Sequence, residues 1–93
     1  MIYEIEYHEL VVREDIPRLG KKEKDRVRKS IESKLVSAPE TFGKPLRRSL
    51  KGYRSLRVGD FRVVFKIVGK VVKVLAIKHR SKVYEEVDNK KGV

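Results

Sequence analysis

Hydrophobic and polar side chains alternate at the start of the chain. In the segment IYEIEYH, residues 2–8, Tyr3, Ile5 and Tyr7 would face one way and the two glutamates the other. A period of two residues is typical of a half-buried β-strand. We therefore predict that the chain begins with a strand.

Two helical segments are predicted to follow, packed as a hairpin. Residues 9–19 read as a short helix that Pro17 kinks or breaks, because proline has no N–H to donate and its ring crowds the preceding turn. Residues 21–36 carry charges of both signs around one narrow apolar stripe, which is typical of an amphipathic helix. The stripe consists of Val27, Ile31 and Leu35.

Three strands joined by tight turns are predicted in the second half. They span residues 53–58, 61–67 and 71–78. The two-residue spacers at 59–60 and 69–70 favour antiparallel hairpins. In the middle strand the odd-numbered residues are apolar and should face the helices, whereas Arg62 and Lys66 should face outward.

These elements give the order β-α-α-β-β-β and an α+β fold class. We expect a twisted antiparallel four-stranded sheet with the helical hairpin on one face. A chain of 93 residues, numbered 1–93, should form a single domain around one core. Residues 1–43 would hold the first strand and the hairpin, residues 44–80 a basic three-stranded sheet, and residues 81–93 a C-terminal tail.

The composition excludes several classes of protein. Cysteine is absent, so no disulfide framework, thiolate metal site or cysteine nucleophile can form. No run of about 18 apolar residues is present, and the N-terminal residues do not resemble a signal peptide. A cytoplasmic protein without a membrane-spanning segment is therefore expected.

Positive charge is concentrated in one part of the chain. Residues 44–80 contain twelve Lys or Arg and one acid, Asp60, so they carry the whole formal net charge of +11. A solvated surface would mix both signs, so this segregation favours a polyanionic partner. Nucleic acid is the expected partner, with a merely basic surface or an acidic protein partner as the alternatives.

Metal and cofactor chemistry is not expected. His8 and His79 are the only histidines, and no acidic cluster lies near the basic strands. The glycines of the second half occupy turn positions rather than a phosphate-binding loop. Tyr53 and Phe61 could stack on RNA bases, but the alternation assigns Phe61 to the core and leaves Tyr53 open.

The basic strands suit RNA cleavage without a metal. The ribose 2′-OH attacks the adjacent phosphorus and the 5′-oxygen leaves, which requires two proton-transfer groups and fixed positive charge for the phosphorane. Arginine forks bind phosphate oxygens bidentately. Arg54 and Arg57 have opposite parity, so a β-bulge near Ser55 would bring them to one face. Simple RNA binding is the alternative that the residues leave open.

Three segments resemble the RelE/ParE superfamily of bacterial and archaeal toxins. They are LKGYRSLRVGDFRVVF at 50–65, KHRSKVY at 78–84 and DIPRLG at 15–20. RelE-like members are ribosome-dependent mRNA endonucleases silenced by a cognate antitoxin. ParE-like members share the fold and poison DNA gyrase. The resemblance, over about residues 2–86, implies a type II mRNA interferase toxin whose partners are an acidic antitoxin, the ribosome and mRNA. The alternatives are a ParE-like gyrase inhibitor and a catalytically inactive nucleic-acid-binding protein of this fold.

The resemblance also implies residue roles. Arg62, which follows the aromatic residue of GDFR, would be the key phosphate-binding arginine, and Tyr84 would stack on or activate the substrate. The family pattern has two lysines where this chain has Arg54 and, one register later, Arg57, and arginine is a poorer proton acceptor. The candidate catalytic residues are Arg54, Arg57, Arg62, His79 and Tyr84, and the candidate RNA-binding residues are Lys44, Arg47, Arg48, Lys51, Lys78 and Arg80.

Overall fold

The computed structural model of the chain describes residues 2–83. Its helical segments are the π-type η1 (Val11–Asp15), α1 (Ile16–Arg18), α2 (Lys21–Ser30), the π-type η2 (Ile31–Leu35), α3 (Pro39–Phe42), and the 3₁₀ turns η3 (Arg48–Leu50) and η4 (Arg80–Lys82). Its strands are β1 (Glu4–Tyr7), β2 (Lys44–Pro45), β3 (Arg54–Val58), β4 (Phe61–Val68) and β5 (Val71–His79).

The described residues form one sheet of five strands in the order β1-β5-β4-β3-β2. β1 runs parallel to β5, and all other neighbours are antiparallel. The α+β class with a helical hairpin on one face is confirmed, but the expectation of four strands, all antiparallel, is wrong. β1 joins the sheet through the intervening helices rather than through a tight turn, so the hairpin rule does not govern its direction. β2 has two residues, too few to show alternation.

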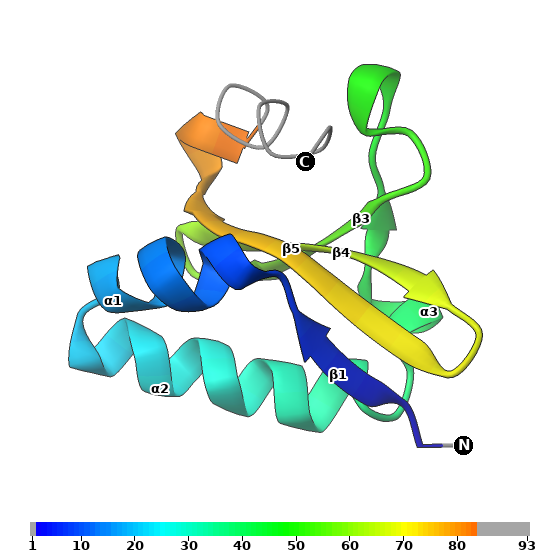
Figure 1. Ribbon diagram of the computed structural model, residues 1–93, viewed down its shortest axis with the longest axis horizontal. Helices are drawn as coiled ribbons and strands as arrows, with labels where there is room; N and C mark the ends of the chain where they lie inside the picture. Colours follow the sequence, from blue (N-terminus) through cyan, green and yellow to red (C-terminus); the bar gives the residue numbers. More distant parts are fainter. Residues whose placement is uncertain (1, 84–93) are drawn as a thin grey trace.

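The helices cover one face of the sheet and close the main core. Figure 1 shows α1 and α2 side by side below the strands. The predicted stripe of Val27, Ile31 and Leu35 is buried and packs against Val63 and Phe65 of β4, which confirms both the helix and the alternation of the strand. Within residues 2–83 no helix combines the length and the apolarity needed to cross a membrane.

The first helical segment passes through Pro17 rather than ending there. Before the proline, η1 has π-type hydrogen bonding, with the N–H of Ile16 donating to the C=O of Val11. Pro17 then lies at the start of α1, and it has no N–H to donate to the carbonyl one turn earlier in η1. The segment ends after Arg18. The expected disruption is therefore a change of hydrogen-bond pattern within one helical segment.

The opposite face of the sheet, toward which Arg62 and Lys66 were expected to point, is partly apolar. The expectation of a wholly basic outer face is therefore corrected. A second, smaller cluster lies there, and it is covered by residues 44–53 and by the start of the C-terminal segment. Its buried members are Leu50, Val64, Leu75, Ala76 and Val83, with Leu46 and Tyr53 packed against them. Leu75 and Ala76 both face this side, because the β4–β5 register shifts between Val64 and Phe65 and leaves Leu75 as a bulge. The cations on this face therefore flank an apolar patch.

Gly43 allows α3 to approach β4 closely. A Cβ added at Gly43 would lie 2.3 Å from Cζ of Phe65 and 3.1 Å from the carbonyl oxygen of Pro39. Phe65 is completely buried and has no free direction in which to move. We expect Gly43→Ala to lower the free energy of unfolding by about 3 kcal/mol, the upper end of the range for overpacked cores. Urea denaturation of the variant measures this change.

Gly20→Ala provides the matched control. Its added Cβ would meet only the carboxylate end of the Glu23 side chain, which can swing aside. The loss should be about 1 kcal/mol or less, since Gly20 is the N-cap of α2, a position where alanine is less favourable than glycine. Equal stability of the two variants would contradict the packing of Gly43 on Phe65.

Candidate active site

Three cationic side chains lie side by side across the sheet. Arg57 on β3 pairs with Arg62 on β4, and Arg62 pairs with Lys78 on β5. Directly opposed residues of neighbouring strands share a face, and like charges in these positions repel. The shared face is the one turned away from the helices, because Val63, next to Arg62, packs in the core beneath them. We call Arg57, Arg62 and Lys78 the cation row.

Arg62 is the centre of the cation row and carries an unsatisfied donor. The residue is partly buried, and its Nη1 is buried without a hydrogen-bond partner among residues 2–83. The hydroxyl of Ser55, diagonal to Arg62 on β3, is also buried and unpartnered. Such groups are rare in folded proteins, because each costs about 1–3 kcal/mol and a charged group costs more. The two donors are therefore suited to bind oxygens of an anionic ligand. No sequence pattern indicated a role for Ser55, since a lone serine in a strand is not distinctive.

Lys78 is held within the protein rather than at its surface. Its side chain is 7% exposed, and its Nζ lies 2.7 Å from Oδ1 of Asp15. The other carboxylate oxygen of Asp15 accepts the N–H of Ile77 at 3.0 Å. This contact occurs beyond the end of β1, which pairs with β5 only as far as Val74. Lys78 therefore contributes charge to the row from a buried position and is not an exposed phosphate contact.

Sequence reasoning missed Asp15, although a signal for it exists. Val11, Asp15 and Leu19 recur at a spacing of four, so an acid occupies the buried face of a helical segment. A carboxylate on such a face needs a partner. The partners are the Lys78 ammonium and a backbone N–H that the end of β1 leaves exposed.

Arg54 does not join the cation row. The β3–β4 register is continuous from Arg54 to Val58, so the bulge predicted near Ser55 is absent and parity separates Arg54 from Arg57. Arg54 pairs with Phe65, whose side chain lies in the core under the helices. Its Nη1 donates to the carbonyl oxygen of Gly43 at 3.0 Å. The structure therefore places Arg54 beside α3, on the other face of the sheet.

His79 and Arg80 lie at the end of β5. The His79 ring makes an edge contact with Phe61 at a centroid distance of 5.9 Å, and its Nδ1 lies 2.9 Å from Oγ of Ser81. His79 follows Lys78 and has the opposite parity, so it is not part of the cation row. Arg80 is exposed, and its N–H donates to the carbonyl of Asp60. Tyr84, the remaining catalytic candidate, lies outside the described residues.

The other RNA-binding candidates lie on a projecting connection. All four are exposed: Lys44, Arg47, Arg48 and Lys51. Leu50, completely buried, anchors the connection to the sheet. Arg48 has a φ of +57°, a left-handed conformation that is uncommon outside glycine. Residues 44–53 and η4 both rise from the sheet on the side away from α1 and α2 (Figure 1), so exposed cations stand beside the face of the cation row.

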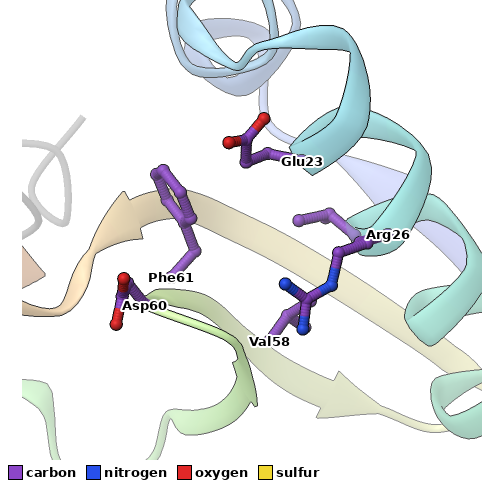
Figure 2. Close-up of a pocket in the computed structure, with 6 residues that line it drawn as sticks. Glu23, Arg26, Val58, Asp60 and Phe61 are labelled. Carbon is purple, nitrogen blue, oxygen red and sulfur yellow. The ribbon is translucent and has the colours of Figure 1, made fainter.

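A hollow on the helix side of the sheet differs from the cation row in its charges. This hollow between α2 and the β3–β4 turn is lined by Glu23, Arg26, Val58, Asp60 and Phe61, together with Val27. In Figure 2 the Arg26 side chain reaches from α2 toward Val58, with Glu23 and Phe61 across the hollow. Charges of both signs and none of the candidate residues meet there. Within residues 2–83 no group of three or more histidine, aspartate or glutamate side chains could hold a metal ion.

Comparisons with known proteins agree on this architecture. The toxin–antitoxin complex RelBE2 from Mycobacterium tuberculosis has a chain that matches with a TM-score of 0.79 and 29% identity, over 86% of this chain and all of the other. A mutant of the E. coli toxin RelE in the free state matches in fold, with a TM-score of 0.72 and 20% identity over 97% of this chain and 94% of the other. Toxin RelE of Mycobacterium tuberculosis is 52% identical over 33 residues, 36% of this chain and 34% of the relative, so the match spans about a third of that curated relative.

A helical hairpin on one face of a mixed sheet is therefore a fold that this chain shares with the RelE-like toxins. A family model described as the ParE toxin of the type II toxin–antitoxin system parDE matches residues 5–84. The chain belongs to this family, within the RelE/ParE superfamily, and the resemblance seen in the sequence is confirmed.

Proposed function

We propose that the protein is a toxin that cleaves messenger RNA on the ribosome, without a metal, and thereby inhibits translation. The cation row is the observation that carries this proposal. Arg57, Arg62 and Lys78 are neighbours in the strand register of one face, and Arg62 keeps a buried donor that no group among residues 2–83 satisfies. Repulsion between Arg57 and Arg62 and the unmet donor both disfavour the folded chain by itself, whereas the Lys78 ammonium is paired with Asp15. A phosphate bound at this face would relieve both.

The chemistry follows from where negative charge develops. The 2′-OH oxygen forms a bond to the adjacent phosphorus, and the bond from phosphorus to the 5′-oxygen breaks. Arg57 and Arg62 would bind the non-bridging oxygens as they gain charge in the phosphorane, with Lys78 as a supporting charge. A base takes the proton of the 2′-OH, and an acid protonates the leaving oxygen. His79 and Tyr84 are the candidates for these transfers.

This route predicts the chemistry of the cut ends. The upstream fragment should end in a 2′,3′-cyclic phosphate and the downstream fragment in a 5′-hydroxyl. Primer extension on message incubated with translating ribosomes and the protein locates the cuts. Ligation of the downstream fragment should succeed only after treatment with polynucleotide kinase and ATP, which converts a 5′-hydroxyl to a 5′-phosphate.

A message with 2′-deoxyribose at the mapped cut site is the matched control. It keeps the phosphate but lacks the attacking hydroxyl, so cutting there should stop while neighbouring sites are unaffected. Cleavage of the deoxy site at the normal rate would contradict attack by the 2′-OH. An intact unmodified message would leave a catalytically inactive binding protein as the conclusion.

An acidic antitoxin is the protein partner that the same charge favours. The M. tuberculosis structure above is that of a toxin–antitoxin complex, and the E. coli RelE mutant has also been solved with an antitoxin RelB peptide. Acidic side chains laid over the exposed cations of residues 44–51 would gain favourable electrostatic energy, which high salt would weaken.

Poisoning of DNA gyrase is the second candidate function. It is favoured by the family model, which is described as a ParE toxin. A supercoiling assay with purified gyrase separates the two functions. Inhibition of gyrase together with an intact message on the ribosome would assign the chain to the ParE-like activity.

A further inference from the structure

A second pair of cations lies on the same face, farther along the sheet. Lys66 on β4 pairs directly with Lys73 on β5. Lys66 follows Arg62 by four residues and has the same parity, so both pairs face away from the helices. Four residues of strand cover about 13 Å. The pair is therefore too far from Arg62 to share one phosphate with it.

Glu6 of β1 is the register partner of Lys73 on its other side, but the two side chains form no ion pair. Among residues 2–83 no carboxylate lies within ion-pair distance of Lys66 or Lys73. Two ammonium groups directly opposed across strands repel each other. The sheet thus contains a second pair of opposed cations, and no ion pair among residues 2–83 offsets their repulsion.

An aromatic ring lies beside this pair. The Nζ of Lys66 lies 5.5 Å from the centroid of the Tyr53 ring. Tyr53 is half-buried because it packs against the second apolar cluster, which holds its ring in place next to Lys66. A cation over a ring is a weak contact at a partly exposed site. The flexible Lys66 side chain can leave it for a phosphate and uncover a ring face for a base.

We propose that Lys66, Lys73 and Tyr53 form a second nucleotide-binding site for single-stranded RNA. The inference rests on the proposed function, in which the cation row holds the phosphate that is cut. The two lysines bind another phosphate of the same strand, and Tyr53 stacks on the adjoining base. Cations beside a stacking ring are the combination that binds single-stranded nucleic acid. An acidic protein would bind the lysines through ion pairs and would not require the Tyr53 ring.

The test is binding of a short, fluorescein-labelled RNA that is 2′-O-methylated throughout and so cannot be cut. Affinity for single strands scales with salt concentration to the power of about −0.7 per phosphate contact, so two lost contacts lower the slope by about 1.4 and weaken binding about 25-fold at 0.1 M salt. We expect Lys66→Gln/Lys73→Gln to approach these values in fluorescence anisotropy. Tyr53→Leu should weaken binding about fivefold or more with an unchanged slope, because stacking releases no counterions.

Lys22→Gln/Lys29→Gln is the matched control. Both of its lysines are exposed on α2, so it has the same net charge as the test variant but keeps the sheet face intact. Equal losses in the two double variants would overturn the site, since net charge alone would then explain them. Wild-type binding by Lys66→Gln/Lys73→Gln would also overturn it. Melting temperatures at or above wild type are expected for the sheet variant, because its repulsive pair is removed.

The proposed function and this site can fail separately. Message cleavage by the wild-type protein decides the former, and binding of the uncuttable RNA decides the latter. If the wild type does not cleave message but the variants lose RNA affinity as expected, the second nucleotide-binding site is supported and the proposed nuclease activity is rejected. If the sheet variant binds RNA normally but loses affinity for poly-L-glutamate, the lysines belong to an acidic partner and the proposal is wrong.

Discussion

Replacing Arg62 with alanine is expected to lower the rate of message cleavage by about 100-fold or more. Removal of one fixed donor to charge that develops in a transition state has effects of about 100- to 1,000-fold. The unpartnered Nη1 of Arg62 is the donor best placed for this role among the described residues. The measurement is single-turnover cleavage of message on translating ribosomes, quantified by primer extension.

Stability distinguishes a catalytic loss from a folding defect. Arg62 faces Arg57 and Lys78, so its removal relieves repulsion, and the free energy of unfolding should stay within about 1 kcal/mol of wild type. Arg13→Ala removes the same charge from the helix layer, where Arg13 is exposed and paired with Glu9, and should cleave normally. Full cleavage by Arg62→Ala would show that the cation row is not the active site.

Asp15→Asn is expected to lower the free energy of unfolding by about 3–5 kcal/mol. This is the usual cost of removing one partner from a buried ion pair, because the other charge is left buried and unpaired. The Asp15 side chain is fully buried against Lys78. If the amide oxygen still accepts the N–H of Ile77, its NH₂ group then faces the Lys78 ammonium. Urea denaturation measures the loss.

A double-mutant cycle with Lys78→Met tests whether the loss comes from the unpaired charge. Asp15→Asn/Lys78→Met removes the buried charge altogether, so it should recover most of the stability that Asp15→Asn loses. The double variant should be less active in cleavage, since the row then lacks one cation. A double variant as unstable as the sum of the single variants would show that Asp15 and Lys78 do not stabilise the fold through each other.

Local patterns predicted the parts of the fold in which one face is buried. The spacing of Val27, Ile31 and Leu35 identified the covering helix, and the alternation around Val63 identified the strand beneath it. Both patterns follow from burial of a single continuous face. The direction of β1 could not be predicted in this way, because it depends on the path of the chain through the helices and not on any side chain.

The positive charge of the candidate site could be predicted from the sequence, but the residues that form it could not. The segregation of positive charge pointed to the strands that carry the cation row, and the GDFR motif pointed to Arg62. Arg54 lies on the other face of the sheet from Arg57, because β3 has no bulge between them. Only the strand register shows this. The pairing of Lys78 with Asp15 joins residues 63 positions apart in the chain, beyond the reach of any local pattern.

The unpaired residue Leu75 determines which face of the sheet each later residue of β5 points to. Lys73 lies on the open face, so strict alternation would send Lys78 toward the helices and turn His79 outward. The extra residue reverses this assignment and brings Lys78 into line with Arg62. The bulge at Leu75 is therefore what aligns these two cations: a continuous ladder from Val74 onward would place Ile77, instead of Lys78, opposite Arg62.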